Sequence, residues 1–465
     1  MSPSQVAVAE NLLLRRFNVR AYSDVEEGGR FQGVKTSGVR QGQESAPERN
    51  IRLTGQQITG WFVARYIAAI IGIWVALITP ASVTLALRVG QIDPAHKGTS
   101  LAFVASLGAL AALFANPIFG ALSDSSTSRF GQRRPFIIGG MIGGTLSIFF
   151  IGFFATTVNM VTVGWVAAQL CFNAAIAATI AVLPERVPTE MRGKVSGWMG
   201  MTTQVGVVGG VFLIQLAGTE GYGPFVWPAV VGALMVLPFL LTLREKPRSK
   251  DEVVPLSLKS IASSLWINPV RHRDFALAWL GRFLVWTSLY SLTTYKTYFL
   301  IDTLHYTTKT VAPVLTVAMF TLALCIAASS IPSGWLSDKV GRRKPFVVAA
   351  SLLFAVAMVI VAYAGSVSQF VVGVGVAGLA QGMYLGVDYA LVSEVLPDSS
   401  EQAARGMGFF NLSSTIPQTI APVLAPVLLK IGATGTTGNY AALFGAAAVF
   451  AVVAACVTQQ IRGVR

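Results

Sequence analysis

Long apolar runs alternate with short polar segments along the chain, from about residue 60 to its end. Each run holds close to, or more than, the roughly 20 apolar residues that cross a bilayer as an α-helix. The pattern therefore predicts an all-α integral membrane protein with twelve transmembrane helices. The runs fall at approximately 62–87, 100–122, 136–156, 159–183, 195–217, 224–243, 275–300, 310–334, 345–365, 368–393, 407–430 and 439–460.

Two polar segments divide the chain into predicted domains. Residues 1–59 show no sustained apolar period, and we expect them to form a cytoplasmic tail, mostly disordered. Residues 246–274 form the longest internal polar stretch, which we expect to be a cytoplasmic central loop. Between and after these segments we predict an N-terminal six-helix bundle at 60–245 and a C-terminal six-helix bundle at 275–465.

The composition agrees with a membrane location. Hydrophobic residues make up 53% of the chain and charged residues 12%, whereas a soluble domain carries about 25% charged residues. So few charges could not cover a soluble core of this size. The composition therefore argues against a soluble enzyme, a disordered protein and a fibrous repeat.

The basic residues predict the orientation of the protein. Lys and Arg total 35 against 21 Asp and Glu, a net charge of +14, and most of the basic residues lie in the tail and in alternate loops. The positive-inside rule then places both termini in the cytoplasm, with the protein in the cell (inner or plasma) membrane. We assign five other basic residues to the outer side: Arg88, Lys97, Lys296, Lys309 and Lys430.

The two predicted bundles repeat one another. The motif GALSD at 120–124 recurs as GWLSD at 334–338, and GQRRPF at 131–136 recurs as GRRKPF at 341–346. The matches keep their order across six spans, which indicates two pseudo-symmetric halves in the same orientation with a site between them near mid-membrane. Three further pairs fit the same register: Glu185 with Glu394, Arg192 with Arg405, and Arg65 with Arg282.

This doubled loop motif, between spans two and three and again between spans eight and nine, resembles that of the major facilitator superfamily. The stretches SDSSTSRFGQRRPFIIGG (123–140) and FALAWLGRFLVW (275–286) are similar to the sucrose-type and glycoside–pentoside–hexuronide cation symporters. The resemblance implies the major facilitator fold, with spans one, four, seven and ten lining a central cavity. Sucrose-type carriers place an acidic residue in span four shortly before an Asn; here the Asn corresponds to Asn173, and the matching position holds Gln169.

One carboxylate lies well inside a predicted span. Asp388 is about 9 Å from the inner end of span ten, and Arg282 lies at a similar depth in span seven. An ionisable residue inside a membrane is costly and marks a functional site by default. We predict that Asp388 carries the coupled proton with Arg282 as its partner. The alternative is an ion pair that only holds two helices together.

Polar and aromatic residues on the cavity-lining spans are the candidate substrate ligands. Gln381, Tyr384 and Asp388 share one face of span ten, whereas three glycines on another face (Gly378, Gly382 and Gly386) suit close helix packing. The span-seven aromatics suit stacking on a sugar ring, although plain packing would show the same spacing. The candidates are Arg65, Gln169, Asn173, Trp286, Tyr290, Gln381, Tyr384, Asn411 and Gln418.

The charged loop motifs are the candidate cytoplasmic gate. We expect the aspartate that ends span two or eight to pair with an arginine that begins span eleven or five, so that breaking the pair opens the inner face. Topology signals alone would explain part of this charge. The gate candidates are Gly120, Asp124, Gly131, Arg133, Arg134, Glu185, Arg192, Gly334, Asp338, Gly341, Arg342, Arg343, Glu394 and Arg405.

The sequence therefore predicts a secondary active transporter that works by alternating access, with proton-coupled symport of a small polar solute such as a sugar or glycoside. One alternative is a proton-antiport exporter of a drug or secondary metabolite. A polytopic enzyme and a channel fit less well, since the three histidines are scattered and no H-E-x-x-H or nucleotide-binding loop occurs. We expect no cofactor, no metal and no nucleic acid, a proton (or sodium) gradient as the driving force, and a monomer in the lipid bilayer.

Overall fold

The computed structural model of the chain describes residues 60–245, 272–395, 400–433 and 438–462. The predicted tail at 1–59 and most of the predicted central loop lie outside these described residues. The described residues form helices and no strands, and twelve helical segments are long and apolar enough to cross a membrane. The predicted all-α class with twelve spans is confirmed.

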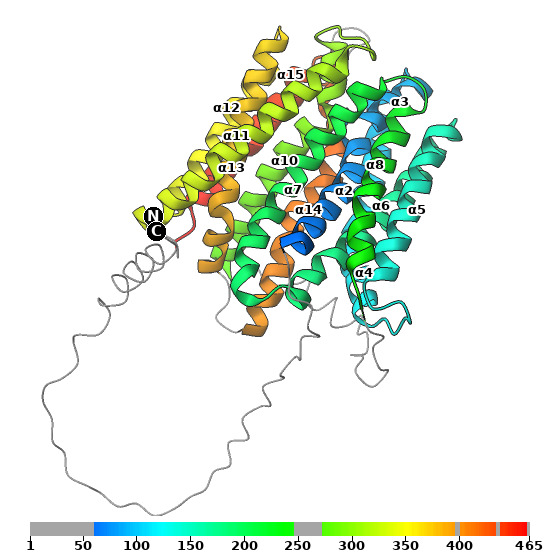
Figure 1. Cartoon of the computed structure of the whole chain (residues 1–465). Helices are drawn as coiled ribbons and strands as arrows, with labels where there is room; N and C mark the ends of the chain where they lie inside the picture. The colour runs from blue at the N-terminus through cyan, green and yellow to red at the C-terminus, as the bar shows by residue number, and fades with distance from the viewer. Residues whose placement is uncertain (1–59, 246–271, 396–399, 434–437, 463–465) are drawn as a thin grey trace, which may run out of the picture. The chain divides into compact units, whose positions relative to one another are not determined.

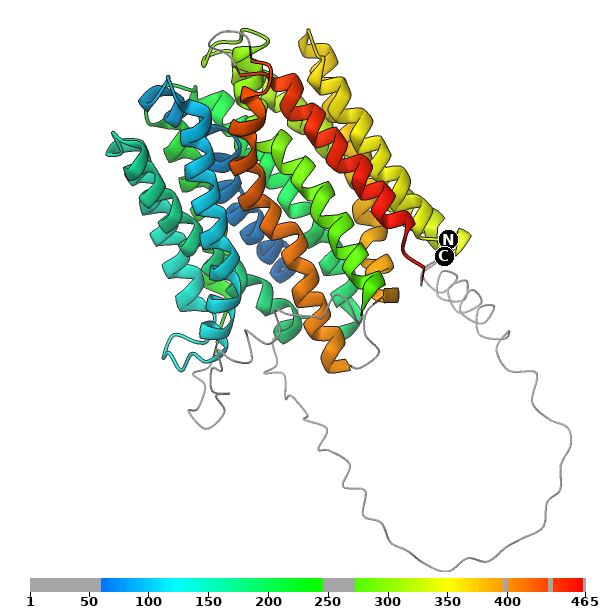
Figure 2. The ribbon, with the colours of Figure 1, turned by 180° about the vertical axis from the view of Figure 1, so that it is seen from behind.

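We call the first six of the twelve spans the N-half and the last six the C-half. Figures 1 and 2 show the helices coloured in chain order, from blue at the N-terminus to red at the C-terminus. The N-half contains α2 (Gly60–Thr79), η1 (Pro80–Thr84), α3 (Leu85–Ile92), α4 (Lys97–Asp124), α5 (Arg134–Phe153), α6 (Val158–Arg186), α7 (Thr189–Ala217) and α8 (Gly223–Thr242). The C-half contains α10 (Arg273–Asp302), α11 (Val311–Val340), α12 (Lys344–Ala362), α13 (Val367–Val395), α14 (Ser400–Lys430) and α15 (Tyr440–Gln459).

The first span is a continuous helix with a π-helical turn inside it. Pro80 begins this turn, η1, and has no N–H group to give to the helical hydrogen-bond ladder. A π-turn accommodates such an interruption within a helix and is frequent at functional sites. The widened turn also contacts α10, where the Thr297 hydroxyl donates a 3.3 Å hydrogen bond to the Ser82 carbonyl.

Glycines allow α13 to approach α11 closely. A Cβ atom added at Gly378, Gly382 or Gly386 would lie 2.7, 2.4 or 2.4 Å from a main-chain oxygen of α11. No larger side chain fits at these distances, so the predicted packing face of span ten is confirmed. Tyr384 and Asp388 lie on a different face of α13, toward α10.

Several polar contacts join the halves at one end of the bundle. We call the end at which α10 finishes the Asp302 end, and the opposite end, where α5 and α12 begin, the Arg133 end. The Asp302 carboxylate pairs with the Lys97 ammonium across the boundary between the halves. Tyr295 and Tyr298 of α10 also donate hydrogen bonds across it, to Gly98 O (3.0 Å) and Ala86 O (2.8 Å).

Helix packing also crosses the boundary between the halves. α4 packs against α14, and α7 packs against α11. The Ser106 hydroxyl of α4 donates a 2.9 Å hydrogen bond to the Thr419 carbonyl of α14. Two helix pairs and the Asp302-end contacts therefore hold the N-half against the C-half.

Candidate functional site

A buried ion pair joins α10 to α13. Arg282 Nη1 donates to Asp388 Oδ2, and each residue is only 2% exposed. Tyr384, one helical turn before Asp388, is a hydrogen-bond partner of the same carboxylate. The predicted contact between Asp388 and Arg282 is therefore present, while its role in proton coupling stays a prediction.

Aromatic rings surround the guanidinium of this pair. Its carbon lies 4.4 Å from the centre of the Phe410 ring and 5.8 Å from the centre of the Trp286 ring. Ring faces attract a cation, so they stabilise Arg282 in a nonpolar part of the bundle. The pair is thus enclosed by three helices, α10, α13 and α14.

A small cavity lies next to the ion pair, between α10, α12 and α13. Trp286, Gln381 and Tyr384 line it together with apolar side chains. The Trp286 indole Nε1 and the Gln381 Oε1 are buried, and neither has a hydrogen-bond partner among the described residues. Both residues line this cavity, whose free volume of about 10 Å³ holds about one water molecule.

The predicted substrate ligands of the N-half bond to one another. Asn173 Nδ2 donates to the Gln169 side-chain oxygen at 3.0 Å and to its main-chain oxygen at 2.8 Å. Asn116 of α4 approaches the Asn173 oxygen at 3.5 Å. Both predicted residues are buried in α6, so the structure places them in a local amide network within the N-half.

The remaining predicted ligands lie on three helices. Tyr290 follows Trp286 by one turn on α10, and the two rings pack with their centres 5.8 Å apart. Arg65 on α2 and Asn411 on α14 are exposed, and Gln418 on α14 is half-buried. The structure therefore brings together the predicted residues of α10 and α13, whereas those of α2, α6 and α14 are more dispersed.

An arginine-centred cluster closes the Arg133 end of the N-half. Arg133 forms ion pairs with Asp124 and Glu185, and its Nε donates to Glu185 Oε1 at 3.1 Å. Burial opposes the charged form, but the hydrogen bonds and charges of Glu185 and Asp124 outweigh it and raise the pKa of Arg133. The cluster joins the ends of α4 and α6 to the start of α5.

The C-half repeats this cluster with the equivalent residues. Arg343 Nη1 lies 2.8 Å from Asp338 Oδ1, and its Nε lies 2.6 Å from Glu394 Oε1. The hydrogen bond that Arg343 donates to Glu394 is the largest cause that raises the pKa of Arg343. The structure thus shows which arginine of each loop motif holds the cluster: Arg133 in the first and Arg343 in the second.

Of the two predicted gate pairs across the halves, only Asp338 with Arg192 falls among the described side chains. Asp338 pairs with Arg343 of its own half, and Arg192 donates to the carbonyl oxygens of Val187 (2.8 Å) and Pro184 (2.6 Å). Among the described side chains no ion pair joins Asp338 to Arg192. The predicted pair belongs to the state in which the cytoplasmic face is closed, so it stays a prediction. The Arg405 side chain lies outside the described residues.

The predicted gate glycines have different surroundings. Gly131 has φ +103°, and a Cβ there would lie 2.3 Å from the Glu245 Cβ. Gly341 also has a positive φ, +65°, where it caps α11. A Cβ at Gly334 would lie 3.1 Å from the Gly386 carbonyl oxygen, whereas Gly120 has open space around it.

Glu245 is a functional neighbour that the sequence analysis missed. Its Oε2 accepts hydrogen bonds from the main-chain N–H groups of Arg133 (2.8 Å) and Arg134 (3.0 Å), at the start of α5. A carboxylate at a helix N-terminus satisfies free N–H groups and suits the helix dipole. The only sequence signal was an acidic residue directly after span six, more than a hundred residues from its partners.

Two lysines of the outer-side set also occupy unpredicted positions. Lys97 pairs with Asp302, whose other carboxylate oxygen accepts a 2.7 Å hydrogen bond from Tyr440. Lys296, which the sequence analysis assigned to the outer side, is buried inside α10 with 1% exposure. α10 continues to Asp302, so Lys296 lies within the helix near its Asp302 end, and the side of the membrane to which it belongs stays a prediction.

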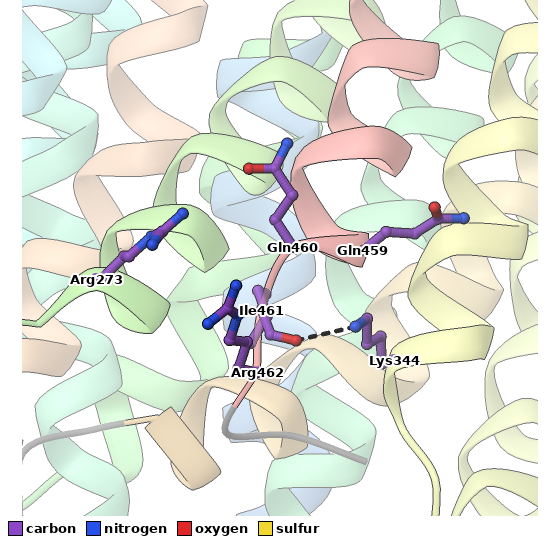
Figure 3. A pocket seen from close by; sticks show the side chains of 6 residues that line it. All are labelled: Arg273, Lys344, Gln459, Gln460, Ile461 and Arg462. Atoms are coloured by element: carbon purple, nitrogen blue, oxygen red, sulfur yellow. Dashed lines mark hydrogen bonds between the residues drawn. The ribbon is translucent and has the colours of Figure 1, made fainter.

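A surface pocket at the Arg133 end of the C-half is separate from these sites. Arg273, Lys344 and Arg462 line it with two glutamines (Figure 3). The Lys344 ammonium donates a 2.9 Å hydrogen bond to the Ile461 carbonyl, and the Arg462 N–H donates to Asp274. These bonds attach the segment after α15 to the starts of α10 and α12.

A family model described as Major Facilitator Superfamily matches residues 67–328 and 314–459 of the chain. The chain belongs to the Major Facilitator Superfamily. Its fold and family are therefore those of transporters. The predicted superfamily is confirmed, and the glycoside branch within it stays a prediction.

Solved structures of this superfamily share the fold at low sequence identity. An inward-facing, unoccupied bacterial homologue of the human lysosomal transporter Spinster has a TM-score of 0.66 and 17% identity, over 86% of this chain and 97% of that chain. The nucleoside transporter NupG gives 0.67 and 14%, over 86% and 98%. A D-xylose-proton symporter gives 0.64 and 15%, over 87% and 98%.

Curated relatives match only a part of the chain. A "General alpha-glucoside permease" of Schizosaccharomyces pombe is 28% identical over 130 residues, which is 25% of this chain and 23% of the relative. A "Putative multidrug resistance protein MdtD" of Salmonella paratyphi B is 34% identical over 107 residues, 23% of this chain and 22% of the relative. The match thus spans less than a quarter of the length of either relative.

Proposed function

We propose that this Major Facilitator Superfamily transporter is a proton-coupled symporter of a small hydroxylated solute such as a sugar or glycoside. The observation that carries the proposal is the buried Arg282–Asp388 ion pair, beside which Trp286 and Gln381 each hold a buried polar atom without a hydrogen-bond partner among the described residues. A solute hydroxyl both donates and accepts, so it would satisfy the two groups together.

The ion pair supplies a means of coupling in this proposal. While Arg282 contacts Asp388, the carboxylate keeps its charge because the guanidinium neutralises it. A helix movement or a bound solute that draws Arg282 away would leave a buried, unpaired carboxylate, which favours uptake of a proton. Asp388 would then alternate between a charged form and a neutral form as the transporter changes state.

The proposed orientation puts the Arg133 end in the cytoplasm, together with both termini, in the plasma or inner membrane. The Asp302 end then faces outward, and its contacts between α10 and the N-half act as a closed outer gate. In this interpretation the structure is inward-facing. The two six-helix bundles at 60–245 and 275–465 would rock about the central site in a functional monomer.

The test is uptake of radiolabelled sugars and glycosides into proteoliposomes under an imposed pH gradient. We expect accumulation of at least one such solute when the outside is acidic, and its loss when a protonophore removes the gradient. Accumulation that continues without the gradient would contradict proton coupling.

One observation favours a second candidate, a proton-antiport exporter. The relative from Salmonella paratyphi B carries a multidrug resistance name. Direction distinguishes the two functions: an exporter would accumulate antibiotics in inverted vesicles when the lumen is acidic, and it would not accumulate glycosides under the symport gradient.

A further inference from the structure

A basic pocket lies where three membrane-spanning helices end. Arg273 is the first residue of α10, Lys344 is the first residue of α12, and Gln459 is the last residue of α15. These helices are three of the twelve that are long and apolar enough to cross a membrane. The pocket that Arg273, Lys344 and Arg462 line is therefore at the level of the lipid headgroups.

The pocket gathers positive charge from three parts of the chain. Figure 3 shows Arg273 and Lys344 on either side of the segment after α15, which carries Arg462. Among the described residues no carboxylate lines the pocket, and no ion pair engages any of its three basic side chains. The first turn of α12 also holds no acidic residue, so the positive end of its dipole adds to the potential.

The N–H groups of the pocket suit the oxygens of a phosphate group. Lys344 uses one of its three donors in the bond to the Ile461 carbonyl, which leaves two. The side chains of Arg273 and Arg462 make no hydrogen bond with another described residue. A guanidinium presents its donors as a planar fork that matches two phosphate oxygens. The free volume of about 400 Å³ falls within the roughly 300–1,000 Å³ of small-ligand sites.

Exposed apolar side chains continue from the pocket along two of the same helices. Leu352 of α12 is about 12 Å along the axis from Lys344, and Val452 of α15 is about 10 Å from Gln459. These two side chains are 44% and 42% exposed, and α12 packs against α15. A soluble phosphate would contact only the basic pocket, whereas a phospholipid would also cover these apolar side chains. The combination therefore favours a lipid.

We propose that this pocket binds the headgroup of an anionic phospholipid, with the phosphate on the three cations and the acyl chains against α12 and α15. Basic pockets between membrane helices recognise such headgroups through their charge. Phosphatidylglycerol carries one net negative charge, whereas the choline of phosphatidylcholine neutralises the charge of its own phosphate. The inference concerns binding alone, so it is independent of the proposed symport function.

The first test measures which lipid the purified full-length chain retains. The chain in detergent receives an equimolar mixture of dioleoylphosphatidylglycerol and dioleoylphosphatidylcholine, and native mass spectrometry measures the bound ratio. The acyl chains are identical, so the ratio reports the headgroup. We expect it to favour phosphatidylglycerol at least about tenfold. Arg273→Gln with Arg462→Gln should lower the ratio at least about fivefold, and Arg273→Lys with Arg462→Lys should keep most of it.

A matched control removes two charges from the Arg133 end of the N-half. Arg129 lies between α4 and α5, Lys194 lies near the start of α7, and both are exposed. Arg129→Gln with Lys194→Gln lowers the net charge of the chain by the same amount as the pocket variant. We expect the lipid ratio to change by less than about twofold. An equal loss in the two double variants would overturn the proposal, as would a natural chain without a preference for the anionic lipid.

Photolabelling locates the lipid without any substitution. A phosphatidylglycerol with a diazirine in its acyl chains should label peptides of α12 and α15 in the full-length chain. Unlabelled phosphatidylglycerol should compete with it, whereas phosphatidylcholine should not. Labelling that omits α12 and α15 would overturn the proposal. Inhibition of the labelling by inorganic phosphate at the same concentration as the lipid would indicate a site for a soluble phosphate and would also overturn it.

Discussion

The Asp388 carboxylate is held by one cation and one hydroxyl in a nonpolar region. Removing one member of a buried ion pair costs about 3–5 kcal/mol, because the other charge is left without a partner. We expect Asp388→Asn to abolish proton-driven accumulation while solute exchange across proteoliposomes continues, since only the proton carrier is lost. Accumulation against a gradient by the Asn variant would show that the pair is structural.

A double variant separates folding from coupling at this pair. Asp388→Asn alone should lower the melting temperature, whereas Asp388→Asn with Arg282→Gln should recover part of the loss because no unpaired charge remains. Neither protein should couple to protons. Recovery of coupling in the double variant would contradict the proposed role of Asp388.

The sequence identified single functional candidates where a charged residue interrupts an apolar run. Asp388 and Arg282 stood out because charges are rare inside apolar runs, and the structure places them in contact. Glu245 could not be found, because it reaches Arg133 through a loop contact between distant parts of the chain. The burial of Lys296 was not predicted, because a count of basic residues by side does not show which way a lysine in a span points.

At the scale of elements, the loop between α4 and α5 depends on a glycine. Gly131 has φ +103°, and a Cβ there would collide with Glu245. We expect Gly131→Ala to destabilise the protein by about 1–3 kcal/mol, through backbone strain and displacement of the Glu245 cap. Gly120→Ala, in the same motif but with open space, should have no effect or stabilise α4 by up to about 1 kcal/mol. Equal melting temperatures of the two variants in detergent would refute this difference.

The sequence predicted which segments form helices more accurately than it predicted where each helix ends. Apolar runs identify all twelve spans, since only a helix satisfies its own backbone within a membrane. α11, however, continues to Val340, past the apolar run that ends near 334, and stops where Gly341 takes a positive φ. Hydropathy detects the part of a helix that lipid would surround, whereas the capping residue determines where the helix stops.

At the scale of the whole molecule, the contacts at the Asp302 end should bias the transporter toward its inward-facing state. We expect Asp302→Asn, which loses the ion pair to Lys97 in the other half, to raise the outward-open population about two- to fivefold. Tyr440→Phe removes only a hydrogen bond within the C-half and should change it less. The readout is labelling of a cysteine introduced at Thr293 by an impermeant thiol reagent added outside; equal labelling of both variants would contradict the gate.

The orientation of the bundle can be tested on its own. Reporter domains fused after residue 258, in the predicted central loop, and after residue 433, between α14 and α15, should report opposite sides of the membrane. We expect the first to be cytoplasmic, because the basic loops at the Arg133 end follow the positive-inside rule. Two reports from the same side would contradict the proposed topology.

Three hydroxyl groups of α10 donate hydrogen bonds across the boundary between the halves. Their acceptors are the main-chain oxygens of Ser82, Ala86 and Gly98. A main-chain oxygen is present whatever side chain the position carries. Substitutions of Tyr295, Thr297 or Tyr298 therefore remove these hydrogen bonds directly. Substitutions at the acceptor positions leave the accepting oxygens in place. A genetic selection for variants that favour the outward-facing state should therefore yield many replacements on α10. It should yield few replacements on η1, α3 and α4, which carry the acceptor oxygens.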